Sequence, residues 1–153
     1  MKQYEFFFVV TLSNSVQSSK NIENAFKMRG INVDRIDYTV TKDKTEEIGQ
    51  RCRIKNQLRT ICTNAINSQK KPNPILILQD SYLCFSEIKN EILNEEEFIR
   101  KKSSLHTMII NDEADTLVRP DNNILRTMKK EENTTVIQFS ATYHLSLIHI
   151  SEP

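Results

Sequence analysis

Two polar clusters follow apolar runs in the second half of the chain. Asp112, Glu113 and Asp115 come directly after one run, and Ser140 and Thr142 come directly after the next. A pair of carboxylates can hold a hard divalent cation and position a water for in-line attack, which is the chemistry of nucleotide hydrolysis. The same residue types also cap helices and satisfy nearby backbone groups. The residues alone therefore leave a hydrolytic site and ordinary turns as alternatives.

The segments that must position these clusters are five short apolar runs separated by helix-periodic stretches. The runs are residues 4–12, 31–40, 74–80, 106–112 and 134–142. Helical spacing predicts helices over residues 15–29, 43–68, 86–102 and 123–130, with Gly30 as a C-terminal cap. Short continuous apolar runs suit strands buried on both faces, and their alternation with helices predicts an α/β fold with a mostly parallel sheet flanked by helices. Ligands bind beyond the carboxyl ends of such strands, where both clusters fall.

Composition narrows the class of protein. The chain has 153 residues and a net charge of +1, which fits one domain and neither demands nor excludes a nucleic-acid partner. No apolar run approaches the ~20 residues of a membrane helix, so we expect no membrane association. Cys52, Cys62 and Cys84 are odd in number and widely spaced, which favours buried thiols in a reducing, cytoplasmic compartment. With only two glycines, the chain contains no glycine-rich phosphate loop.

The acidic tetrapeptide and the later Ser-Ala-Thr resemble motifs II and III of the superfamily 2 helicases, the DEAD-box-like ATPases built on RecA-like domains. The resemblance implies that Asp112 holds the Mg²⁺ of bound ATP through water. It implies that Glu113 orients or deprotonates the water that attacks the γ-phosphate. It also implies that Asp115 couples this site to the hydroxyls of Ser140 and Thr142, relaying the nucleotide state to nucleic-acid binding.

A third motif of the same family concerns the nucleic acid. Residues 10–17 resemble motif Ia, in which a strand end runs into a helix N-terminus. The resemblance implies that Ser13, Ser15 and Gln17 contact a nucleic-acid backbone, since helix N-termini offer N–H groups and a positive dipole to phosphate. Residues 79–82 stand where motif Ib would lie. The long stretch between motifs Ia and II favours a divergent member, such as one encoded by a virus or mobile element. DNA and RNA remain alternatives.

The resemblance implies a partial domain. We expect residues 1–144 to form a partial first RecA-like domain, or P-loop NTPase-like fold, that lacks the phosphate-loop strand. That loop is expected upstream of Met1, and the arginine finger in a second domain, so we expect the fragment alone not to hydrolyse ATP. A sheet edge left open by the missing strand predicts poor solubility. Residues 145–153, LSLIHISEP, resemble the in-frame translation of a sequencing adapter, and we expect a non-native tail there.

Other interpretations stay open. The chain could belong to the ATPase motor of a restriction or packaging system. It could instead be a non-catalytic α/β binding domain whose acidic tetrapeptide is accidental. Arg51, Lys55 and Arg59 lie four apart and form one basic stripe on the second predicted helix, which favours a solvated face over a phosphate-tracking surface.

Overall fold

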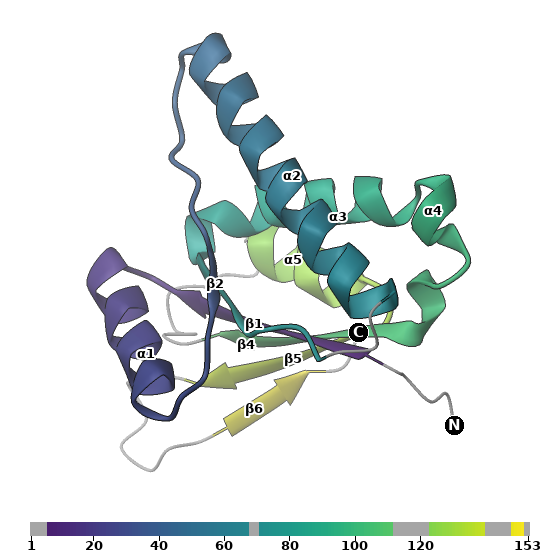
Figure 1. Ribbon diagram of the computed structural model, residues 1–153. Helices are drawn as coiled ribbons and strands as arrows, with labels where there is room; N and C mark the ends of the chain where they lie inside the picture. Colours follow the sequence, from purple (N-terminus) through teal and green to yellow (C-terminus); the bar gives the residue numbers. More distant parts are fainter. Residues whose placement is uncertain (1–5, 68–70, 112–122, 140–147, 152–153) are drawn as a thin grey trace.

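The chain folds around one sheet whose central strands are parallel (Figure 1). The computed structural model describes residues 6–67, 71–111, 123–139 and 148–151. The strands are β1 (Phe6–Ser13), β2 (Asp34–Ile36), β3 (Ile75–Leu78), β4 (Leu105–Asn111), β5 (Thr134–Phe139) and β6 (Ile148–Ser151), in the spatial order β2-β3-β1-β4-β5-β6. The first five are parallel to one another, and β6 runs antiparallel along β5. The predicted α/β fold with a mostly parallel sheet flanked by helices is confirmed.

The helices are divided between the two faces of this sheet. They are α1 (Val16–Met28), α2 (Lys44–Asn67), α3 (Tyr82–Leu93), α4 (Glu96–Ile99) and α5 (Asn123–Lys130), with single 3₁₀ turns η1 (Gln79–Ser81) and η2 (Lys102–Ser104). The connection from β1 to β2 moves toward one edge of the sheet, and the next three connections move toward the other. Because parallel crossovers are right-handed, α1 belongs on one face and the later helices on the opposite face. Figure 1 shows α2, α3, α4 and α5 gathered over one face, with α1 apart from them.

The hydrophobic core lies between the sheet and the α2–α3 layer. In β4, Leu105, Thr107, Ile109 and Asn111 are buried and alternate with half-buried residues, as the two-residue repeat of a strand requires. The buried cluster draws on β1, α2, α3, β4 and β5, for example through Phe8, Leu58, Phe85, Ile109 and Val136. Among the described helices, none combines the length and apolar character needed to cross a membrane.

Helix α1 has well-defined ends. Ser15 caps its N-terminus, because the Ser15 side chain accepts a hydrogen bond from the Ser18 N–H at 3.1 Å. At the other end Gly30 has a φ of +71°, and the N–H groups of Gly30 and Ile31 donate to the carbonyls of Lys27 and Phe26. This is the Schellman pattern, in which glycine takes the left-handed conformation at little cost. The predicted role of Gly30 as a helix cap is confirmed.

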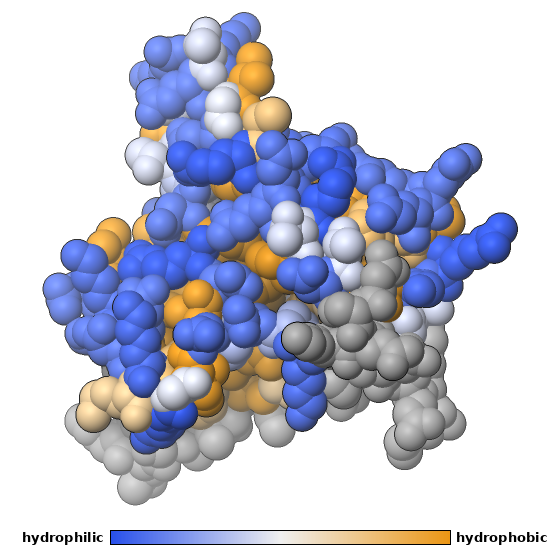
Figure 2. All heavy atoms as spheres, in the orientation of Figure 1, coloured by the Kyte–Doolittle hydropathy of each residue, from blue (hydrophilic) through white to orange (hydrophobic). Residues whose placement is uncertain are grey.

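The basic stripe of α2 faces acidic residues of α3 and Glu95, the residue before α4. The pairs are Arg51–Glu87 at 2.8 Å, Lys55–Glu91 at 3.2 Å and Arg59–Glu95 at 2.7 Å. Both helices advance by four residues from pair to pair, so they run parallel. The hydrogen bond from Arg59 lowers the pKa of Glu95, which keeps that carboxylate charged. Figure 2 shows a largely hydrophilic surface over α2. The stripe is therefore an interhelical ion-pair ladder on a partly solvated face, which agrees with the preferred interpretation, and the phosphate-tracking interpretation stays a prediction.

Several predicted boundaries were wrong. The third helix was expected over residues 86–102, but α3 begins at Tyr82 and ends at Leu93, and extended backbone at Glu95 separates it from α4. Tyr82 and Phe85 are fully buried, so tertiary packing starts the helix earlier than its periodicity indicates. The second strand is only three residues long and pairs on one side.

Cys62 and Cys84 are buried as predicted, but Cys52 is exposed. β6, which pairs along β5, falls within residues 145–153, the predicted non-native tail.

Helix α2 offers a direct test of this packing. Leu58→Ala removes a side chain with 0% exposure, whereas Ile48→Ala changes one on the same helix with 68% exposure. We expect Leu58→Ala to lower the free energy of unfolding by about 2–5 kcal/mol, because a cavity replaces buried methyl groups. Ile48→Ala should change it by less than about 0.5 kcal/mol. Urea unfolding followed by circular dichroism measures both, and similar losses for the two variants would contradict the assigned helix orientation.

Candidate functional site

The candidate site lies at the carboxyl end of β1. β1 sits between β3 and β4, and all three strands end at the same edge of the sheet. The chain leaves β1 toward α1 on one face, but it leaves β3 and β4 toward helices on the other face. Open parallel sheets bind ligands at this kind of reversal, outside the carboxyl ends of the strands. Topology therefore selects the ends of β1, β3 and β4.

Two buried amides meet across the end of β1. Gln79 follows β3, Asn111 ends β4, and Leu12 of β1 is in register with Asn111 on one side and with Ile77 on the other. The Gln79 Nε2 donates to the Asn111 Oδ1 at 3.0 Å. Exposure is 6% for Gln79 and 0% for Asn111. This amide bridge, Gln79–Asn111, ties together the neighbouring strands that flank β1.

One buried N–H donor of the amide bridge remains without an acceptor among the described residues. The Asn111 Nδ2 has no hydrogen-bond partner within the described part of the chain. A buried amide donor without an acceptor costs about 1–3 kcal/mol, so this N–H calls for an acceptor such as a water or a ligand oxygen. Asn111 is also the residue immediately before Asp112. A polar group that is costly for stability therefore stands directly beside the predicted cation ligand.

The residues predicted to contact nucleic acid lie at the carboxyl end of β1 and in the first turn of α1. Ser13 is buried, and its Oγ donates to the Ser15 carbonyl at 3.4 Å. Ser15 is half-buried and serves as the α1 cap, while Gln17 is exposed and its Nε2 donates to the Asn21 Oδ1 at 3.0 Å. The side chains of Ser13 and Ser15 thus act within the loop. The N–H groups of the first helical turn and the Gln17 side chain remain available to an anion.

The remaining predicted site residues lie outside the described residues. These are Asp112, Glu113 and Asp115 after β4, and Ser140 and Thr142 after β5. The described strands that precede them, β4 and β5, are hydrogen-bonded neighbours with Asn111 opposite Gln138. In the described ranges, no three histidine, cysteine or carboxylate side chains gather in a way that could hold a metal ion. The roles predicted for Mg²⁺ and catalysis therefore stay predictions.

Sequence reasoning missed a buried ionic cluster at the other end of the sheet. Glu131, just after α5, accepts hydrogen bonds from the Tyr82 hydroxyl at 2.8 Å and from the Ser86 hydroxyl. Lys89 Nζ lies 3.4 Å from the same carboxylate and 5.7 Å from the Phe85 ring centroid. The available signal was the position of Lys89 within the apolar stripe of α3, between Ile88 and Ile92 and four residues after Phe85.

Comparison of the chain with protein-family models, with curated proteins and with solved structures found no match. The functional inference therefore depends on the residues, the strand order and the geometry at the two ends of the sheet.

A double-mutant cycle tests the amide bridge. Gln79→Ala and Asn111→Ala should show a coupling free energy of about 1 kcal/mol in urea unfolding, because either variant leaves the other amide buried without its partner. Gln17→Ala with Asn21→Ala is a matched control, since it breaks an exposed amide pair of the same 3.0 Å length. Its coupling should not exceed about 0.5 kcal/mol. Equal coupling free energies in the two cycles would show that the buried amide bridge stabilises the fold no more than an exposed amide pair does.

Proposed function

We propose that this chain is part of the first RecA-like domain of a superfamily 2 helicase or translocase. The parent protein would hydrolyse ATP to move along or remodel nucleic acid. One observation carries the proposal: the strand order places the carboxyl ends of β1, β4 and β5 next to one another. The acidic tetrapeptide starts at the residue after β4, and Ser-Ala-Thr starts at the residue after β5. The three resembling motifs thus follow three adjacent strands in one parallel sheet.

The chemistry of this edge fits a hard cation. Asp112 and Glu113, which follow Asn111 in the sequence, offer carboxylate oxygens, whereas the described neighbours Ser13, Gln79 and Asn111 are buried and make hydrogen bonds within the protein. Mg²⁺ takes oxygen ligands and keeps several waters, so a single carboxylate such as Asp112 suffices to hold it beside nucleotide phosphates. Bound Mg²⁺ would neutralise charge on those phosphates. Glu113 would then accept a proton from, or orient, the attacking water.

The amide bridge gives this edge a positioning element. The hydrogen bond between Gln79 and Asn111 holds the last residue of β4 against the start of η1. A catalytic carboxylate must be kept near its productive geometry by neighbours that are themselves locked. Asp112 is covalently bonded to Asn111. By fixing the position of Asn111, the amide bridge would therefore limit the movement of Asp112 during hydrolysis.

Nucleic acid would lie along the N-terminus of α1. The Ser15 cap uses the Ser18 N–H, and the Ser15 carbonyl accepts from the Ser19 N–H, which leaves the first N–H groups of the helix for a phosphate. The first turn contains no acidic residue. The positive end of the helix dipole therefore remains uncompensated by side-chain charge, and a backbone phosphate of DNA or RNA can supply the missing negative charge.

A charge placed in the first turn of α1 tests the proposal on this chain. We expect Gln17→Glu to weaken the binding of a single-stranded oligonucleotide about fivefold, since a carboxylate competes with phosphate for the helix dipole, an effect of up to about 1 kcal/mol. Fluorescence anisotropy at low salt measures the affinity. The substitution favours the helix itself, so a loss of binding cannot be attributed to unfolding of α1.

The matched control is Asn24→Glu, which adds the same charge at an exposed position on the same helix. It lies seven residues away, about 10 Å along the axis, beyond the first turn. Binding that is absent for the unmodified chain, or that falls equally in Gln17→Glu and Asn24→Glu, would contradict the proposed contact.

A further inference from the structure

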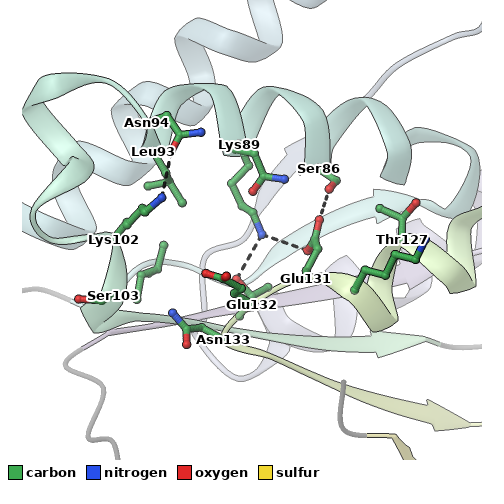
Figure 3. Close-up of a pocket in the computed structure, with 14 residues that line it drawn as sticks. Ser86, Lys89, Leu93, Asn94, Lys102, Ser103, Thr127, Glu131, Glu132 and Asn133 are labelled. Atoms are coloured by element: carbon green, nitrogen blue, oxygen red, sulfur yellow. Dashed lines mark hydrogen bonds and ion pairs between the residues drawn. The ribbon is translucent and has the colours of Figure 1, made fainter.

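A pocket of about 600 Å³ opens at the amino end of the sheet, away from the candidate site (Figure 3). Residues from α3, η2, the start of β4, the end of α5 and the segment between α5 and β5 line it, among them Leu105 and Thr107. Sites for small molecules commonly have volumes of about 300–1,000 Å³. The pocket is large enough for a small organic ligand, and it shares no lining residue with the amide bridge.

The Lys89–Glu131 pair lies at the floor of this pocket. The side chains are 5% and 8% exposed, which is rare for charged groups unless they are paired. The Tyr82 and Ser86 hydroxyls also donate to the Glu131 carboxylate. Burial, together with the adjacent carboxylate, raises the pKa of Tyr82, so that hydroxyl stays protonated and remains a donor. The negative charge of Glu131 is thereby satisfied from within the protein.

Lys89 keeps unused binding capacity. Its Nζ lies 3.4 Å from both the Glu131 Oε2 and the Thr107 Oγ1. Charge-assisted hydrogen bonds of an ammonium are usually about 2.7–2.9 Å long, so both contacts are loose. An ammonium has three protons, and Figure 3 shows this group reaching down from α3 toward Glu131 and the pocket wall. A more strongly charged acceptor could therefore approach Lys89 more closely than its present partners do.

Two further lysines reach the same pocket from other elements. Lys102 comes from η2, where its Nζ donates to the Asn94 Oδ1 at 3.0 Å, and Lys130 comes from the last turn of α5. The charges of Lys89 and Glu131 offset each other. The other charged residues of the lining are Lys102 and Lys130, which are positive, and Glu132, which is negative. The pocket thus favours an anion.

We propose that this pocket binds the phosphate group of a small phosphate monoester. The lining carries three ammonium groups from three elements against the two carboxylates of Glu131 and Glu132, and the attraction of an anion to this positive surplus grows with the ligand charge. The pocket is larger than a bare phosphate needs, and Asn90, Asn133, Leu93 and Leu105 provide amide and apolar contacts for an organic body. The occupant is distinct from the ATP and nucleic acid of the proposed function, and its site is at the opposite end of the sheet.

Glycerol phosphate is a suitable probe, with glycerol as the ligand that lacks the anion. We expect saturable binding of glycerol phosphate in an NMR titration, with shifts at Asn90 and Asn133 and none from glycerol. Lys102→Gln and Lys130→Gln should each weaken it about threefold, the size expected for one partly exposed ion pair. Lys129→Gln is the matched control, because it removes the same charge from the neighbouring exposed residue of α5, which does not line the pocket.

The tested lysines are exposed, so their substitution leaves the buried Lys89–Glu131 pair intact and the fold undisturbed. Equal weakening by Lys129→Gln and Lys130→Gln would overturn the proposal, since it would show general charge attraction. Absence of saturable binding, or equal binding of glycerol, would overturn it as well. A single-stranded oligonucleotide should not displace glycerol phosphate, and displacement would assign the pocket to nucleic acid instead.

Discussion

The parallel pairing of β1 with β3 and β4 is the constraint on which the rest of the structure depends. β1 is the longest described strand, and its register with both neighbours brings Leu12 level with Asn111 and Ile77. That register sets where the strands end, and therefore where Gln79 can reach Asn111. It also separates α1 from the other helices, because the connection from β1 alone moves toward the β2 edge. The candidate site lies at the carboxyl end of β1, where the amide bridge and the change of helices from one face of the sheet to the other occur together.

Helix α3 connects the two ends of the sheet. It begins directly after η1, which contains Gln79. It ends just before Asn94, whose side chain accepts a hydrogen bond from Lys102. Buried aromatic residues hold its first turns on the sheet, and the ion-pair ladder ties its outer side to α2. Most of this attachment comes from buried apolar area, since exposed ion pairs contribute little each. One rigid helix thus supports both the amide bridge and the phosphate pocket, although the two sites share no residue.

Much of the sheet could be predicted from the sequence, because buried parallel strands read as continuous apolar runs. β1, β4 and β5 were predicted close to their observed bounds, and the bounds of α5 were predicted correctly. Gly30 was predicted because a left-handed residue after a helix favours glycine. Contacts between distant segments were not predictable from local pattern. The partners of Arg51 and Arg59 lie 36 residues away, and Glu131 lies 42 residues from Lys89. Gln79 and Asn111 were missed for the same reason.

The coding DNA on both sides of this reading frame provides the most direct test of the central claim, that Asp112 and Glu113 belong to an ATP-hydrolysing RecA-like domain. The account predicts upstream codons for a strand followed by a glycine-rich loop ending in Gly-Lys-Thr or Gly-Lys-Ser, because the phosphates need a backbone cradle and a lysine. It also predicts that downstream codons replace LSLIHISEP with a second domain. A stop codon before Met1, with no such loop, and a chain that ends near His144 would contradict it. The acidic tetrapeptide would then be a turn in an α/β binding domain.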